Sequence, residues 1–327
     1  MMDRRKTLVV LAASGLFTPL ALLAQQPAAR TYRIGFLGIT SAAAHVTLFD
    51  AVRAGLRDLG YVEGRNLVIE ARWAEYHYGR LPGLAAELVR LKVEVIVTHS
   101  TSGVMAAKQA TSSIPIVMAN VGGDPVANGL IASLARPGGN VTGSTTLNQD
   151  IGAKWLEFLK DAMPGAKRIG LLVNPDNRGS FTEKSIDNAA AKLKLEIQVF
   201  EFRGSEALDG TFAAMTKGRV DAVVVMGDRL AVDAAQLAAA AVQRRLLLIG
   251  PAVIAQAGGL IGYGPNVQAV YRRSAYFVDK ILRGAKPAEI PVEQAARIEL
   301  IVNLKTAKAL GIRIPPALMV RADQVIE

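Results

Sequence analysis

The stretch VEVIVTHSTSG (residues 93–103) combines the two features on which the predicted fold depends. A run of β-branched and apolar residues stops abruptly, and four polar residues follow: His99, Ser100, Thr101 and Ser102. The next residues, GVMAAKQA, have the composition of a starting helix. An apolar strand that runs directly into a helix is typical of a parallel sheet covered on both faces. We therefore expect the polar residues at the carboxyl end of a strand and the N-terminus of a helix.

The same alternation of strand and helix continues along the chain on both sides of this stretch. Apolar runs such as YRIGFLG (32–38) and LLLIG (246–250) alternate with segments of helical periodicity, and the rhythm restarts after PGGNVTGS (137–144). Asn303 is placed to cap a last helix that Gly311 ends, with prolines beyond it. The pattern predicts an α/β protein of two doubly wound parallel-sheet lobes.

Composition excludes several classes of function. The chain has 327 residues, 51% of them apolar, which suffices for two domains. It has no cysteine, so disulfides, thiolate metal sites and cysteine nucleophiles are excluded. The net charge of +10 is spread along the chain, which favours a solvated basic surface over a nucleic-acid partner.

The N-terminus has the organisation of an export signal. MMDRRK (1–6) is basic, an apolar stretch follows, and the chain turns polar after Ala24. We predict that residues 1–24 are a signal peptide cleaved near Ala24 and that the mature protein is periplasmic. The alternative is an uncleaved anchor, since the apolar stretch is about long enough to span a bilayer; Gly15 and Pro19 within it favour removal.

Polar residues gather where the predicted strands end, and ligands of open parallel sheets bind at that edge. Hydroxyls at helix N-termini suit a carboxylate, and aspartates suit an ammonium group, so together they suit a zwitterion. Each residue could instead be an ordinary helix cap. The candidate ligand-binding residues are Thr40, Ser41, Ser100, Thr101, Asp124, Asn174 and Asp228.

Motifs for catalysis are missing from the sequence. No metal-binding spacing, nucleophile elbow, phosphate loop or complete dinucleotide fingerprint occurs, so we expect no catalytic residue, metal or cofactor. His99 is read as an orienting or packing residue rather than a base. The aromatic cluster of Trp73, Tyr76 and Tyr78 could cover an apolar ligand or simply pack at the surface.

Several longer motifs occur in a distinctive order: LGYVEGRN (59–66), GGDPV (122–126), RPGGNVTG (136–143), KRIGLLVNPDN (167–177) and NLKTAKALGI (303–312). In this series the chain resembles the ABC-transporter substrate-binding proteins of the tryptophan/tyrosine-binding type, from about residue 32 to about residue 316. The resemblance implies a type I periplasmic binding protein with a three-segment hinge. It implies crossings near Thr145, near residues 251–258 and near residues 289–294. Residues 31–145 with 258–289 would form the N-terminal lobe, and 146–257 with 290–327 the C-terminal lobe.

The resemblance also implies where a ligand is held. Thr40, Ser41, Ser100 and Thr101 match the positions that hold a ligand carboxylate. Asp124, in GGDPV, matches the family's Asp-Pro-Val, and Asn174 and Asp228 match positions of the second lobe that face the cleft. The chain departs from the family pattern at the His99–Ser102 turn and at Pro265-Asn266, both beside the expected groove. An aromatic amino acid is therefore not fixed as the ligand by the resemblance.

The implied function is that of a solute-binding protein of an ABC importer that closes about a hinge. Its partners would be a small amino-acid-like or aromatic carboxylate ligand and a membrane permease, with no nucleic acid, and the protein would be a monomer. The alternatives are a module presenting its ligand to a sensor kinase and an enzyme on the same scaffold. A sugar-binding regulator would need a DNA-binding helix pair where the export segment stands.

Overall fold

The computed structural model describes residues 30–146, 151–175, 183–226, 230, 233–295 and 297–327. The predicted signal peptide and Asp228 lie outside these residues. Thr31–Glu327 form one compact unit, which contains two sheets. In the part of the chain that is described, no helix combines the length and the apolar character needed to cross a bilayer.

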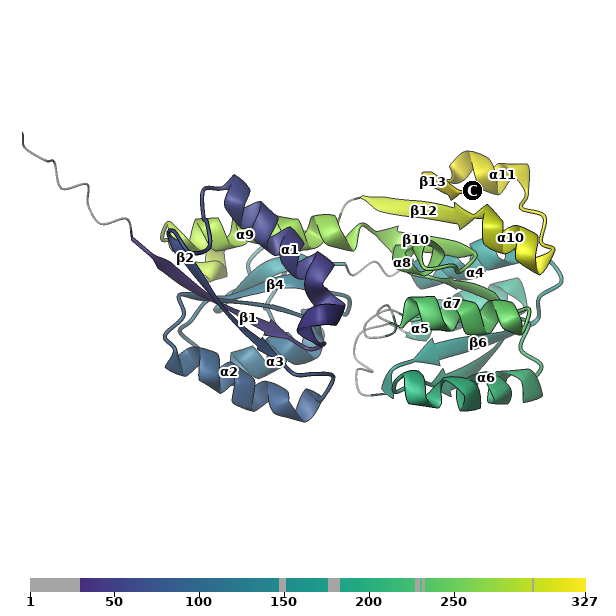
Figure 1. Cartoon of the computed structure of the whole chain (residues 1–327), viewed down its shortest axis with the longest axis horizontal. Coiled ribbons are helices and arrows are strands. Elements are labelled where there is room, and N and C mark those ends of the chain that lie inside the picture. Colours follow the sequence, from purple (N-terminus) through teal and green to yellow (C-terminus); the bar gives the residue numbers. More distant parts are fainter. Residues whose placement is uncertain (1–29, 147–150, 176–182, 227–229, 231–232, 296) are drawn as a thin grey trace, which may run out of the picture. The chain divides into compact units, whose positions relative to one another are not determined.

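The first sheet has the strand order β11-β5-β4-β3-β1-β2, and all of its neighbouring strands are parallel. Helices cover both faces: α1 and α9 pack on one face, and α2 and α3 on the other (Figure 1). The strands are β1 (Tyr32–Gly38), β2 (Leu67–Trp73), β3 (Val95–His99), β4 (Ile116–Val121), β5 (Val141–Thr145) and β11 (Glu293–Gln294). The helices are α1 (Ala42–Asp58), α2 (Leu81–Arg90), α3 (Ser100–Ala110) and α9 (Val267–Leu282), with short 3-10 turns η1 (Tyr78–Arg80) and η5 (Pro287–Glu289).

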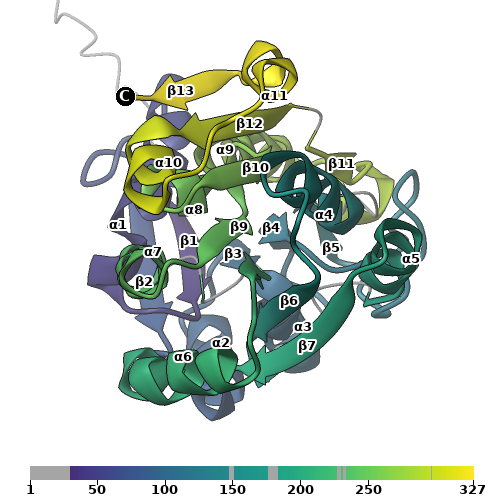
Figure 2. The same cartoon turned by 90° about the vertical axis from the view of Figure 1, so that its right-hand side faces the viewer.

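The second sheet has the order β13-β12-β10-β9-β8-β6-β7 and fans out across Figure 2. Helices α4, α5 and α11 pack on one face and α6, α7 and α8 on the other. The strands are β6 (Arg168–Val173), β7 (Glu196–Glu201), β8 (Ala222–Val225), β9 (Leu247–Gly250), β10 (Ile261–Pro265), β12 (Ile298–Asn303) and β13 (Gln324–Ile326). The helices are α4 (Ile151–Ala162), α5 (Glu183–Leu193), α6 (Leu208–Lys217), α7 (Ala234–Gln243), α8 (Ala252–Gln256), α10 (Leu304–Leu310) and α11 (Pro316–Arg321), and η3 spans Ser205–Ala207.

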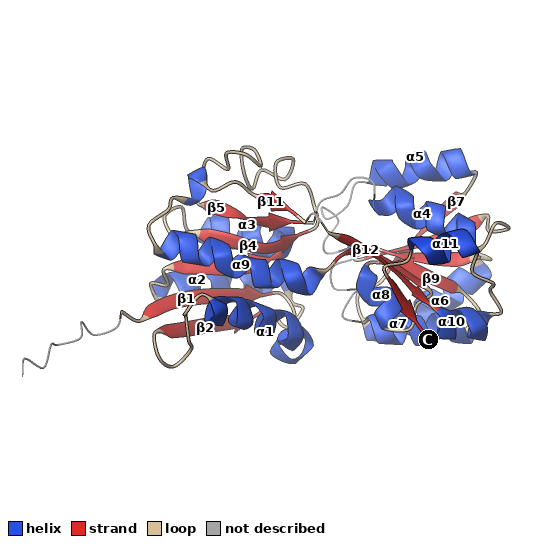
Figure 3. Ribbon diagram, turned by 90° about the horizontal axis from the view of Figure 1, so that it is seen from above, coloured by secondary structure: helices blue, strands red, loops and turns tan. Residues whose placement is uncertain are grey.

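The two sheets share one winding pattern. From the β2 edge of the first sheet the strands lie in the order β2-β1-β3-β4-β5, and from the β7 edge of the second sheet in the order β7-β6-β8-β9-β10. If the strands are numbered as they occur in the chain, both orders are second, first, third, fourth, fifth. Figure 3 shows the strands of the two sheets in red, each set with its own helices around it. The predicted α/β fold of two doubly wound lobes is therefore confirmed, with one difference. Strand β12 runs antiparallel to β10, so the second sheet is mixed.

The chain passes between the sheets three times: after β5, after β10 and after β11. The first and third passages lie beside the expected crossings, but the second does not. The expected boundary at residue 258 assigned Ile261–Pro265 to the first lobe, whereas this strand pairs with β9 and β12 of the second sheet. The glycines at 258 and 259 mark a turn between α8 and β10, with Gly258 at φ +109°, and not the crossing. The expected start of the last segment at 290 is corrected too, because β11 pairs with β5 of the first sheet.

We call the part of the molecule built on the first sheet the first half, and the part built on the second sheet the second half. Helix α9 belongs to the first half, although in the chain it follows β10 of the second sheet. It packs closely against Gly55 of α1, and the absence of a side chain at this glycine makes the contact possible. A Cβ at Gly55 would overlap the backbone oxygen of Arg272 and would crowd the Cβ of Ala275. Buried Tyr271, Ala275 and Phe277 of α9 join the core beneath the sheet. The late segment is thus part of the first half's core rather than an addition to its surface.

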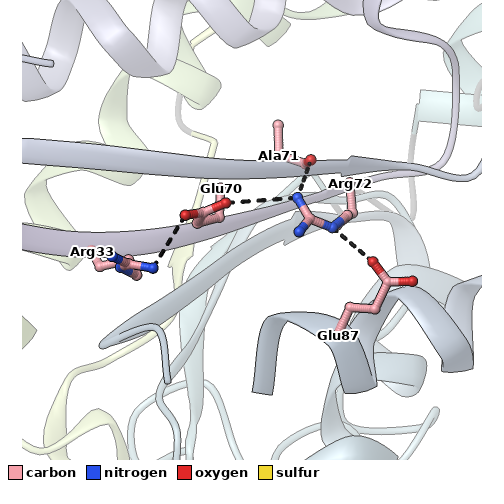
Figure 4. A network of polar contacts seen from close by, with 5 residues as sticks. All are labelled: Arg33, Glu70, Ala71, Arg72 and Glu87. Carbon is pink, nitrogen blue, oxygen red and sulfur yellow. Dashed lines mark hydrogen bonds and ion pairs between the residues drawn. The ribbon is translucent and has the colours of Figure 1, made fainter. Parts of the chain in front are cut away.

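Strand β2 is an edge of the first sheet, and its Glu70 and Arg72 form a charged network with Arg33 of β1 and Glu87 of α2 (Figure 4). The guanidinium of Arg72 donates from Nε to Glu87 Oε2 at 2.8 Å and from Nη1 to the carbonyl of Ala71 at 2.9 Å. Glu70 lies between Arg33, at 3.3 Å, and Arg72, at 3.8 Å. Charges on an edge strand oppose pairing with another chain. We assign the network this role, since ion pairs as exposed as these add little stability.

The C-terminal segment follows the predicted capping, with one addition. Asn303 Oδ1 accepts the amide hydrogen of Thr306 at 3.1 Å, and Gly311 ends α10 at φ +69°. Pro315 and Pro316 do not terminate regular structure, however. Pro316 is the first residue of a further helix, α11, because proline fits the first helical turn, where its missing N–H has no partner to lose.

Candidate functional site

The shared winding pattern locates a candidate site before any side chain is considered. In both sheets the strand order reverses between the first and third strands: β1 and β3 in the first half, β6 and β8 in the second. Ligands of such sheets bind at the carboxyl ends of the strands at this reversal. The residues that follow β1, β3, β6 and β8 are therefore the candidate ligand contacts.

The loops after β1 and β3 are neighbours. The amide of Ile39 donates to Nε2 of His99 at 3.2 Å, which places Thr40 and Ser41 beside Ser100 and Thr101. The two loops that carry the predicted hydroxyls are therefore adjacent, and a shared ligand site stays a prediction. The imidazole of His99 thus accepts a hydrogen bond from the loop after β1.

The members of this cluster differ in what they already bind. Ser41 Oγ caps α1 by accepting the amide hydrogen of Ala44 at 3.2 Å, and buried Thr40 donates to the carbonyl of Ser41 at 3.4 Å. Thr101 Oγ1 is buried and has no hydrogen-bond partner among the described residues. Ser41 thus has the structural role of a cap, while Thr101 keeps its hydrogen-bonding capacity.

Helix α3 begins in an unusual way. Ser100 has φ +61°, a left-handed conformation that costs a non-glycine residue about 1 kcal/mol. His99, at the N-cap position, makes no side-chain capping bond to the helix. Helices α2, α6, α7, α8 and α11 also lack a side-chain bond at the N-cap, whereas Ser41, Asn266 and Asn303 cap α1, α9 and α10, so the left-handed Ser100 is what distinguishes α3. Strain of this kind recurs at functional sites, and amides without a side-chain cap suit an anionic group.

Asp124 lies in the turn after β4, one strand away from the reversal. Its Oδ1 accepts the amide hydrogens of Val126 at 2.9 Å and Ala127 at 3.1 Å. The carboxylate therefore stabilises its own turn through one oxygen. Its place as a ligand contact stays a prediction.

In the second half, Asn174 follows β6 and is buried. Its Nδ2 donates to the hydroxyl of Tyr78 in the first half at 3.0 Å. This bond shows that the end of β6 reaches the turn after β2. Tyr78 is one of three aromatic residues for which the sequence left open a role as cover for an apolar ligand or as surface packing. Asp228, predicted to follow β8, lies outside the described residues and stays a prediction.

An aromatic cluster packs beneath the first half's loops. The rings of His45 and His99 stack with centroids 4.4 Å apart at an interplanar angle of 21°. Phe36, Trp73 and Tyr271 lie against His45 at centroid distances of 5.9, 5.7 and 5.2 Å. Burial lowers the pKa of His99 to about 4, and burial together with the neighbouring imidazole lowers the pKa of His45 to about 2. Both rings are neutral at pH 7, so they pack as aromatic groups.

Trp73, which contacts His45, also packs against the backbone of Gly38. A Cβ at Gly38 would overlap the Trp73 ring, so the glycine leaves room for the indole beside the end of β1. The ring also meets Phe49 edge-on, at 5.5 Å and 89°. Trp73 is therefore part of the packing, whereas Tyr78 points its hydroxyl to the second half.

Comparison with known proteins identifies the family. The sequence pattern of the ABC transporter substrate binding protein family matches residues 33–326, and the chain belongs to that family. A tyrosine-binding protein of Clostridioides difficile is 28% identical over 287 residues, covering 85% of this chain and 81% of the relative.

Two solved structures agree closely with the fold. A conserved domain protein from Vibrio cholerae has a TM-score of 0.83 at 26% identity, covering 90% of this chain and 100% of its own. An ABC domain from Streptococcus pneumonia, solved in complex with L-Trp, has a TM-score of 0.82 at 25% identity, with the same coverage of 90% and 100%. The fold is that of the type I periplasmic binding proteins, as the resemblance in sequence implied.

Proposed function

We propose that this chain is the extracytoplasmic solute-binding component of an ABC importer. It binds a small amino-acid-like or aromatic carboxylate ligand between its two halves and does not transform it. It delivers the ligand to a membrane permease and acts as a monomer.

One observation carries the ligand class: helix α3 starts at the strand-order reversal with a buried hydroxyl in its first turn that has no partner among the described residues. Ser100 and Thr101 stand at this N-terminus, and Thr101 Oγ1 is buried without a partner among the described residues. Backbone amides and a hydroxyl in this position suit a carboxylate, because the helix dipole favours negative charge there. Two relatives support an aromatic amino acid, since one is a tyrosine-binding protein and another was solved with L-Trp.

The mechanism follows from the connections between the halves. Three chain passages between the sheets allow a hinge motion that opens and closes the groove between the strand ends. Closure buries the solute and completes its polar contacts. In this proposal the Asn174–Tyr78 hydrogen bond joins the two rims on the side of β2 and β6.

Calorimetry with a matched set of ligands tests the proposal. L-tryptophan and L-tyrosine should bind and should raise the melting temperature, since a ligand of the folded state stabilises it. Tryptamine and tyramine lack the carboxylate and should bind at least about tenfold more weakly, the loss of a charged hydrogen bond. Indole-3-propionate keeps the carboxylate and lacks the ammonium group, so it measures the contribution of the aspartates.

Two results would reject the proposal in different ways. Equal affinity for tryptophan and tryptamine would remove the carboxylate site at α3. A chemical product accumulating during incubation with a bound solute would replace the binding role with an enzymatic one.

A further inference from the structure

The end of β1 is held by side chains after its backbone pairing has finished. The β1–β3 ladder ends at the pair Leu37 and Thr98. The hydroxyl of Thr98 then donates to the carbonyl of Leu37 at 2.8 Å, and the amide of Ile39 donates to Nε2 of His99 at 3.2 Å. The imidazole therefore supplies an acceptor one step beyond the last backbone pair.

The protein needs this acceptor because the chain leaves β3 at His99. Ser100 turns to φ +61° and begins α3, so the strand does not continue alongside the β1–α1 loop. Ile39 is buried, and a buried amide without a partner is costly. Nε2 accepts a hydrogen bond only when it carries no hydrogen, so the hydrogen of the neutral ring is on Nδ1.

The other side of the loop is fixed as well. The carbonyl of Ile39 accepts the amide hydrogen of Tyr76 at 2.9 Å, and the carbonyl of Gly38 accepts that of Ala74 at 2.9 Å. Ile39 is thus held between the turn after β2 and the imidazole from β3. Thr40 and Ser41 follow it directly.

The ring of His99 cannot move freely. His45 of α1 stacks on it, and Phe36 of β1 and Tyr271 of α9 lie at centroid distances of 6.4 and 6.0 Å. The titratable groups in ring contact with His99 are therefore His45 and Tyr271, and the hydrogen bond to Nε2 comes from a backbone amide. The direction of the Nε2 lone pair is set by packing.

We propose that His99 is a positioning residue that holds the Ile39–Ser41 segment in its binding conformation through the Ile39 N–H···Nε2 bond, with His45 fixing the ring. The proposal rests on the proposed function, because the segment is a rim of the solute site assigned there. It concerns the loop and not a direct contact between His99 and the ligand.

Two substitutions separate the acceptor from the ring. His99→Phe keeps an aromatic ring for His45 to stack on and removes the acceptor. His99→Gln removes the ring and places Oε1 at the same number of bonds from the backbone as Nε2. With L-tryptophan as the probe, His99→Phe should weaken binding about tenfold, and His99→Gln should stay within about threefold of the unsubstituted protein, as expected for loss and retention of one buried hydrogen bond. Unfolding of each variant gives the separate cost in stability.

Nuclear magnetic resonance reads the bond directly in the unsubstituted protein. A hydrogen bond from N–H to nitrogen transmits a scalar coupling between the two nitrogen nuclei, here Ile39 N and His99 Nε2. We expect that coupling, and slow hydrogen exchange at the Ile39 amide that becomes fast in His99→Phe and stays slow in His99→Gln.

The outcomes are separable from those of the proposed function. Absence of the coupling, or an unchanged Ile39 exchange rate in His99→Phe, overturns the positioning role whatever the ligand. An affinity that is unchanged in a folded His99→Phe variant with a fast-exchanging Ile39 overturns it too, since the loop would then be unnecessary for binding. If the unsubstituted protein binds no amino acid, the proposed function fails while the coupling and exchange still decide whether His99 holds the loop.

Discussion

Asn174 Nδ2 donates a hydrogen bond to the hydroxyl of Tyr78 at 3.0 Å, joining residues 96 positions apart in the sequence. Asn174 directly follows β6, the first strand of the second sheet, and Tyr78 opens the turn η1 after β2 of the first sheet. The bond therefore connects the rims of the two halves directly. Its strength bears on how easily the halves separate.

Replacing Tyr78 by Phe tests this connection. The substitution removes one neutral hydrogen bond, worth about 1 kcal/mol net, and should weaken binding of L-tryptophan by about fivefold if the bond forms in the closed state. Titration calorimetry measures the change. Tyr263→Phe is the control, because the rings of Tyr263 and Phe158 pack together within the second half with centroids 5.0 Å apart. The affinity of this variant for L-tryptophan should not change. Equal effects of the two substitutions would deny the bond a role in closure.

Asp124 permits a separation of turn stability from ligand contact. Asp124→Asn keeps an oxygen to accept the amides of Val126 and Ala127, whereas Asp124→Ala removes it. We expect the alanine variant to lose about 1 kcal/mol of unfolding free energy and the asparagine variant to keep it. If Asp124 also meets the ligand ammonium, the asparagine variant should bind L-tryptophan at least about tenfold more weakly and bind indole-3-propionate equally well. Unchanged binding of both ligands would leave Asp124 as a turn residue only.

The buried histidines predict a dependence of stability on pH. The folded state lowers the pKa of His99 from 6.5 to about 4 and that of His45 from 6.5 to about 2. Between these values and 6.5 the unfolded chain binds more protons than the folded chain. Their contribution to folding stability is therefore complete above pH 6.5 and is lost as pH falls, down to about 4 for His99 and to lower pH for His45, by at most about 1.4 kcal/mol per pH unit for each histidine.

Urea unfolding across that pH range measures the slope, and the variants His99→Phe and His45→Phe supply the comparison. Each variant should have a shallower decline than the unsubstituted protein. A decline of the same slope in both variants would assign the acid sensitivity to other groups.

Two glycines should respond in opposite ways to alanine. Gly143 in β5 has φ +129°, and a Cβ there would overlap the backbone of Met118, so Gly143→Ala should cost more than about 2 kcal/mol. Gly83 lies in α2 with no atom within 4 Å of the position of a Cβ, so Gly83→Ala should stabilise the protein by about 0.5–1 kcal/mol through helix propensity. Thermal unfolding of both variants checks the pair, and a mild effect at Gly143 would contradict the close approach of β4 and β5.

Local signals predicted much of the fold. The alternation of apolar strands and amphipathic helices predicted both sheets, because burial on two faces requires it. Asn303 and Gly311 predicted the limits of α10, because a cap and a left-handed glycine act within one turn of the chain. The proline pair at 315 and 316 misled, since a proline stops one helix and starts another equally well.

Features that depend on distant contacts could not be predicted from local pattern. Gly258 and Gly259 signalled a turn but not which sheet the next strand would join; the pairing of Ile261–Pro265 with β9 and β12 decides that. Hydroxyls near a strand end do not show which one becomes a cap, as Ser41 does, and which remains without a partner among the described residues, as Thr101 does. Tyr78 gave no sign of its bond to Asn174, because the two meet only when both sheets are formed.

The three passages of the chain have a consequence for how the protein is made. A ribosome or an export channel releases the chain from its N-terminus, so β1 to β5 emerge long before α9 and β11, which complete the same core. The core of the first half therefore cannot be completed until Val267–Gln294 has been released, after most of the second sheet. Until then the apolar side chains of α1 that α9 covers stay exposed to solvent. A truncation before residue 267 should for this reason leave a nascent chain in need of a chaperone even though every strand from β1 to β5 is present.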